Sequence, residues 1–138
     1  MKKLLILLSV TAMLWACNRQ QHGIVTDKLV LNNGAKWKVD TGTGSRVKDL
    51  KAILKNFYNQ SDQSLVACKK TDKALENSLS AMVSACKMTG PPHNALHQWL
   101  EPLEDQVAEL KQSSTTGEAA RIIKNINLQM ALYTQYFE

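Results

Sequence analysis

Apolar side chains recur every three or four positions from residue 46 to the end of the chain. This spacing is typical of helices that bury one face against a common core. Short connections place such helices antiparallel to their neighbours. The pattern therefore predicts an all-α fold, an up-down-up-down four-helix bundle, with helices over 46–59, 62–88, 92–112 and from Thr115 onward.

The ends of these helices carry recognisable start and stop residues. Ser45 can cap the first helix, and Thr115 with Glu118 has the spacing of a capping box for the fourth. Gly90 is expected to close the second helix, and the two prolines that follow it favour a new helix start.

A different pattern precedes the helices. Polar and apolar residues alternate over 29–39, and Asn33-Gly34 stands between the two alternating runs. Asn-Gly is the preferred pair for a two-residue turn, so a small N-terminal β-hairpin is expected. Such a hairpin is marginal alone and must pack on the bundle, with Trp37 as its expected anchor.

The first residues have the features of an export signal. Lys2 and Lys3 precede an apolar run that is too short to span a bilayer, which predicts a signal peptide over 1–16. Leu14-Trp15-Ala16-Cys17 resembles the lipobox of bacterial lipoproteins. That resemblance implies lipidation of Cys17, a tether over 17–28, and a membrane anchor facing the periplasm, with the outer membrane favoured.

The length and the net charge of the chain limit the classes of function that it can have. The chain has 138 residues, so the bundle and hairpin over 29–138 form one domain. Removing Lys2 and Lys3 leaves 15 basic residues against 12 acidic ones, a net charge of 15 − 12 = +3. This charge is too small to indicate nucleic acid as a partner. The sequence shows no carboxylate pair and no nucleophile with a base in a recognisable motif, so an enzyme is not expected.

The residues around the second turn suggest a metal site. His93 and His97 are four apart and share one face of the third helix. The turn brings Cys86 and Met88 from the end of the second helix towards them. Thiol, thioether and imidazole ligands favour Cu(I), and Zn(II) also accepts Cys and His.

Two further methionines are candidate ligands for this metal site, and they also allow haem b as an alternative ligand. Met82 and Met130 occupy core positions at about the level of His97 and are additional candidate ligands. Non-covalent haem b would use His97 with one of these methionines, and is an alternative to copper. A bundle that supports an envelope complex and binds no metal is the other alternative, and the protein partner is unknown.

The two remaining cysteines are not expected to pair with each other. Cys68 and Cys86 are eighteen residues apart, which is about 27 Å along one helix and far beyond disulfide reach. Cys68 lies in the middle of the apolar face, so core packing is expected there. Cys86 lies beside the histidines, where binding a metal would protect its thiol from oxidation.

Residues 31–138 also resemble uncharacterised envelope lipoproteins of Gram-negative bacteria. The shared pattern is C-x-M-x-G-x-x-H-x-x-x-H, which falls here on Cys86, Met88, Gly90, His93 and His97. No activity comes with this resemblance. It favours reading the Cys, Met and His residues as one unit, while the choice of metal depends on ligand chemistry alone.

Overall fold

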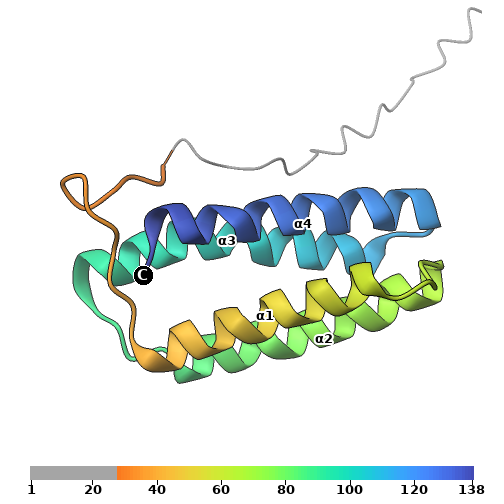
Figure 1. The fold of residues 1–138 in the computed structure, drawn as a ribbon, viewed down its shortest axis with the longest axis horizontal. Helices are drawn as coiled ribbons and strands as arrows, with labels where there is room; N and C mark the ends of the chain where they lie inside the picture. Colours follow the sequence, from red (N-terminus) through yellow and green to blue (C-terminus); the bar gives the residue numbers. More distant parts are fainter. Residues whose placement is uncertain (1–27) are drawn as a thin grey trace, which may run out of the picture.

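The computed structural model describes residues 28–138. They form four helices, and each helix runs antiparallel to the one before it (Figure 1). The all-α prediction is confirmed. The expected signal peptide, Cys17 and most of the tether lie outside the described residues. The helices are α1 (Thr41–Asn59), α2 (Leu65–Ala85), α3 (Gly90–Gln112) and α4 (Thr116–Tyr136).

Helix α1 begins five residues earlier than the sequence pattern indicates. Asp40 caps it, because its Oδ1 accepts the backbone N–H of Thr43 at 2.6 Å. Ser45, the expected cap, therefore lies inside the first turns of α1. The prediction was wrong because an aspartate cap outweighs the low helix propensity of the two glycines between them.

Helix α2 is shorter than expected at both ends. Ser64 caps its start by accepting the N–H of Ala67 at 3.3 Å. Its last hydrogen bond runs from the Cys86 N–H to the carbonyl of Met82. The next N–H, that of Lys87, donates instead to Asp40 Oδ2 at 2.8 Å. This contact with the start of α1 diverts the chain out of the helix.

Gly90 does not close α2, contrary to the prediction. It is the first residue of α3 and has a φ of +70°, a conformation that favours glycine. The cap of α4 follows the prediction more closely. Thr115 accepts the N–H of Glu118 at 3.2 Å, while the Glu118 carboxylate accepts from Ser114 at 3.0 Å. In a capping box the Glu118 carboxylate would accept the N–H of Thr115, so the observed bond to Ser114 lies one residue earlier than expected.

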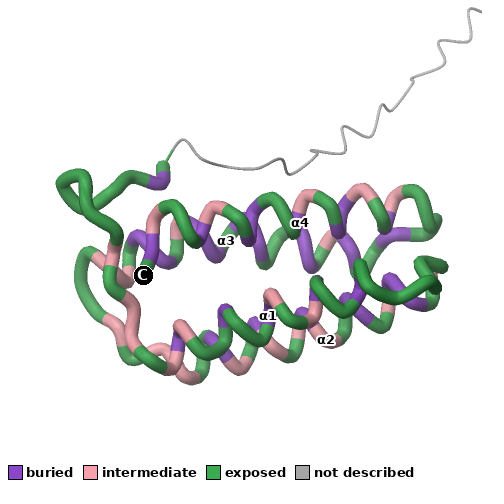
Figure 2. Tube along the Cα trace, in the orientation of Figure 1, coloured by how far each residue is buried: buried purple, intermediate pink, exposed green. Residues whose placement is uncertain are grey.

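The core lies between the α1–α2 pair and the α3–α4 pair, and buried positions line the inner side of all four helices (Figure 2). A reciprocal pair of hydrogen bonds joins α3 to α4. Trp99 Nε1 donates to the carbonyl of Gln129, and Gln129 Nε2 donates to the carbonyl of Trp99, both at 2.9 Å. Every core residue of the described chain lies between Leu29 and Phe137, so residues 18–138 retain the whole described fold.

The residues before α1 form a tight turn and then run beside the end of the chain. Asn33 and Gly34 have positive φ values of 51° and 89°, and Asn32 and Ala35 exchange backbone hydrogen bonds of 2.9 and 3.0 Å. Trp37 donates its backbone N–H to Tyr136 and accepts the N–H of Glu138. The turn therefore has the expected conformation, whereas the two-stranded hairpin stays a prediction.

None of the helices in residues 28–138 is long and apolar enough to cross a membrane.

Candidate metal centre

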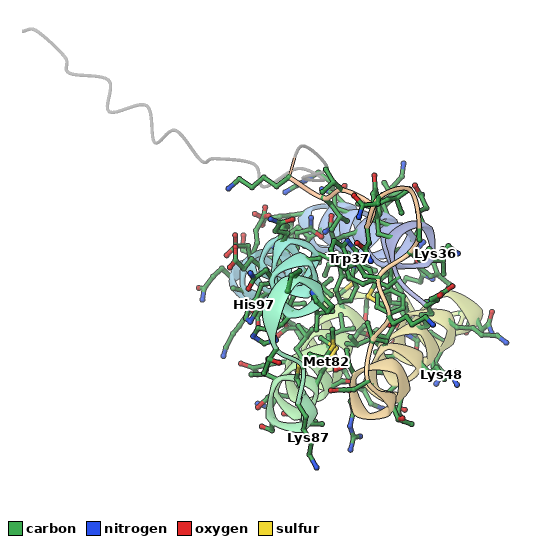
Figure 3. All side chains as sticks on the ribbon, turned by 90° about the vertical axis from the view of Figure 1, so that its left-hand side faces the viewer. Lys36, Trp37, Lys48, Met82, Lys87 and His97 are labelled. Atoms are coloured by element: carbon green, nitrogen blue, oxygen red, sulfur yellow. The ribbon has the colours of Figure 1, made fainter. Side chains whose placement is uncertain are left out.

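The sulfur and imidazole side chains meet where α2 ends and α3 begins. Met82 and Cys86 are one turn apart at the end of α2, and His93 and His97 are one turn apart in the first turns of α3. Figure 3 views the molecule from this end and labels Met82 and His97. The antiparallel packing of α2 on α3 therefore brings together four of the six side chains that the sequence analysis names as candidate ligands: Met82, Cys86, His93 and His97.

Three of these side chains contact one another in series. Cys86 Sγ lies 3.7 Å from Nδ1 of His93, and Nε2 of His93 lies 3.1 Å from Nε2 of His97. The two imidazole rings are nearly perpendicular, with an interplanar angle of 79°. His93 is thus the central member and turns a different ring nitrogen to each neighbour.

A small cavity lies beside this series. Four of the side chains predicted to bind a metal line it, together with three aliphatic ones. Its volume is about 40 Å³, which is enough room for a water molecule or a single metal ion. The lining residues are Met82, Val83, Cys86, His93, Leu96, His97 and Leu100.

The cavity has a buried wall and an open one. Met82 is only 1% exposed, whereas Cys86 and His93 are half-buried and His97 is exposed. The side near His97 is therefore open to an entering ion, and the opposite, buried side of the cavity is lined by sulfur and aliphatic carbon. No carboxylate lines this cavity, which leaves sulfur and imidazole nitrogen as its donor atoms.

The other two methionines are placed elsewhere. Met88, in the non-helical stretch between α2 and α3, is half-buried against the core and does not line the cavity. Met130 is buried on the side of α4 that faces α1, where it lines a separate cavity with Lys51 and Leu54. Their assignment as ligands stays a prediction without support from this geometry.

In residues 28–138, no three His, Cys, Asp or Glu side chains already surround a common point as metal ligands. The orientation of His93 explains this at the cluster described above. Its Nδ1 faces the thiol and its Nε2 faces His97, so one nitrogen cannot serve both neighbours at once. Binding by all three side chains requires a rotation of the His93 ring or of the Cys86 side chain.

Cys68 packs as the sequence predicts. Its side chain is fully buried, and neither it nor Cys86 is in a disulfide. Burial raises the pKa of the Cys68 thiol, which keeps it protonated and unreactive.

Asp40 is a positioning residue that the sequence analysis missed. Backbone N–H groups of Thr43 and then Lys87 hold the pKa of its carboxyl below the ordinary value. The bond to Lys87 fixes the residue next to Cys86 against the start of α1. The capping role is readable from Asp40-Thr41-Gly42-Thr43, but a contact across forty-seven residues is not.

Comparison with known proteins finds no matching family model, no similar curated protein and no similar solved structure. The fold and the cluster define the chain as an all-α bundle with a Cys–His–His series at one end, and its function is inferred from that series.

Proposed function

We propose that this protein binds one Cu(I) ion at the cluster of Cys86, His93 and His97. The observation that carries the proposal is the contact of these three side chains in series beside a cavity of about 40 Å³. Met82, whose side chain lines the same cavity, is a fourth candidate ligand.

The donor atoms favour a soft metal ion. Thiolate, thioether and imidazole suit Cu(I), whereas Mg²⁺ and Ca²⁺ require oxygen ligands. The separation of 3.1 Å between the two Nε2 atoms also suits two imidazoles on one ion, since metal–nitrogen bonds are about 2.0–2.1 Å long for Zn²⁺. Zn(II) is therefore the second candidate. Haem b would require α2 and α3 to separate, because the cavity is far smaller than a porphyrin.

Binding requires a local rearrangement and the release of a proton. The Cys86 thiol loses its proton as the thiolate binds the ion, and each histidine binds in its neutral form. The partial exposure of Cys86 and His93 leaves room for the side-chain rotation that the contacts require.

A competition titration tests this proposal. Residues 18–138 are titrated with Cu(I) under reducing conditions against a chromophoric Cu(I) chelator, and one equivalent is expected to bind. Cys86→Ala and His97→Ala should each weaken binding by about tenfold or more. Cys68→Ala is the matched control, because it removes a buried thiol that does not line the cavity.

The titration also separates the alternatives. If Cys86→Ala and His97→Ala bind Cu(I) like the parent, the site assignment is wrong. If the parent binds neither Cu(I) nor Zn(II) specifically, the copper proposal is wrong and the metal-free structural alternative is favoured. A Soret band after incubation with haem would instead identify a haem protein.

The location proposed for this activity is the cell envelope. The lipobox-like Leu14-Trp15-Ala16-Cys17 supports a lipid anchor on Cys17, facing the periplasm. Intact-mass analysis of the membrane fraction tests this directly. The mature chain should begin at Cys17 and carry acyl chains, and Cys17→Ala should abolish both features.

A further inference from the structure

Residues 28–38 form an exposed projection at the end of the bundle that also carries the Cys–His cluster (Figure 1). We call these residues the N-terminal tip. Two neighbouring aliphatic side chains lie on its surface, Val30 at 62% exposure and Leu31 at 40%. Together they form a small exposed aliphatic surface on the tip.

Three basic residues belong to the same tip. Lys28, Lys36 and Lys38 are all exposed, and the last two line a shallow cleft of about 450 Å³ with Trp37. Pro91 and Pro92, at the start of α3, also line the cleft, and Glu138 contributes a carboxylate to it. The tip thus combines aliphatic and indole surface with ammonium groups. Figure 3 views the molecule from this end and labels Lys36, Trp37 and His97, and the cleft places Lys36 and Trp37 beside the start of α3.

The tip is also held in place by the rest of the fold. Leu29 is buried in the core, and Trp37 Nε1 donates to the carbonyl of Val30 at 2.7 Å. The backbone of Trp37 bonds to Tyr136 and Glu138. Val30 and Leu31 are therefore presented by an ordered turn, which lowers the entropy lost on docking.

We propose that the N-terminal tip docks on an anionic membrane surface, with Val30 and Leu31 entering the headgroup region and the lysines contacting lipid phosphates. Aliphatic side chains flanked by lysines suit the boundary between acyl chains and anionic headgroups. Charge complementarity favours this partner over a neutral surface. The twelve residues from Cys17 to Lys28 reach at most about 40 Å, so a lipid anchor on Cys17 would keep the tip close to the bilayer.

Vesicle co-sedimentation tests the proposal without metal and without the anchor. Residues 18–138 are mixed with vesicles of phosphatidylcholine alone or of phosphatidylcholine with phosphatidylglycerol. The parent should bind the phosphatidylglycerol vesicles much more strongly. Replacing Lys36 and Lys38 together with glutamine should weaken that binding by about thirtyfold, from the usual contribution of a lysine near an anionic surface.

Matched controls come from the opposite end of the bundle. The double variant Val30→Ser with Leu31→Ser should lose binding, whereas Val66→Ser should not, although Val66 is 78% exposed at the start of α2. Lys70→Gln controls for the loss of one exposed charge far from the tip. Circular dichroism confirms that each variant keeps its helices.

The proposal is overturned if the parent does not bind phosphatidylglycerol vesicles, or if the tip variants bind like the parent. It is also overturned if Val66→Ser weakens binding as much as the tip variants do. Because no metal is present, these outcomes are independent of the copper titration, and either proposal can fail alone.

Discussion

Replacing Asp40 with alanine should both destabilise the bundle and weaken metal binding. The Asp40 carboxylate accepts two backbone N–H groups, from Thr43 in α1 and from Lys87 next to Cys86. The first bond caps a helix, and the second fixes the chain beside the proposed ligand. One substitution therefore removes a contribution to folding and a contribution to the geometry of the site.

The expected loss of stability is about 2 kcal/mol. Removing an N-cap side chain costs about 1 kcal/mol, and losing the charge-assisted hydrogen bond from the Lys87 N–H adds about as much. Asp40→Asn should lose about half of this amount, because its Oδ1 can still accept from Thr43 while its amide nitrogen cannot accept from Lys87. Urea unfolding followed by circular dichroism measures both values.

The control is a second cap at the far end of the bundle. Ser64→Ala removes the N-cap of α2 and should cost about 1 kcal/mol. Asp40→Ala should weaken Cu(I) binding by about tenfold, whereas Ser64→Ala should leave it unchanged. The reasoning is refuted if Asp40→Ala unfolds within about 0.5 kcal/mol of the parent, or if the two variants bind Cu(I) equally well.

Three further predictions concern ionisable groups. The fold lowers the pKa of Asp40, so its stabilising effect should be complete above the unfolded pKa of about 3.9 and be lost as the pH falls below that value. The difference in unfolding free energy between the parent and Asp40→Ala should therefore shrink in acid. A difference that does not change with pH would contradict this. Native protein should react with a thiol reagent at Cys86 but not at buried Cys68, so Cys86→Ala should abolish the fast reaction while Cys68→Ala retains it. Burial raises the pKa of Tyr133 to about 12. In an ultraviolet titration, the parent should therefore show a tyrosine ionisation near pH 12 that is missing from Tyr133→Phe. A difference between the two titrations centred near pH 10, about the ordinary tyrosine pKa, would disagree.

The parts of the fold that follow from local pattern were predictable. A repeat of three and four residues gave the four helices, and Asn33-Gly34 gave a turn with two positive φ values. The contact between His93 and His97 also follows from short-range spacing, since residues four apart share a helix face. Cys86 joined them because a short connection returns the chain antiparallel.

The features that depend on distant contacts were not predictable. The end of α2 is set by the bond from Lys87 to Asp40, two residues that are far apart in the sequence. Met130 was expected near His97 from counting along the helices, but that count fixes only the level of a residue. The direction of its side chain depends on the rotation of α4, which turns Met130 towards α1.

X-ray absorption at the copper edge is the most direct test of the central claim. For residues 18–138 loaded with one equivalent of Cu(I), the account predicts sulfur and imidazole nitrogen bound directly to copper. The sulfur contribution should fall in Cys86→Ala and the imidazole contribution in His97→Ala. Spectra that are identical in the parent and both variants, or that show oxygen ligands alone, would contradict it.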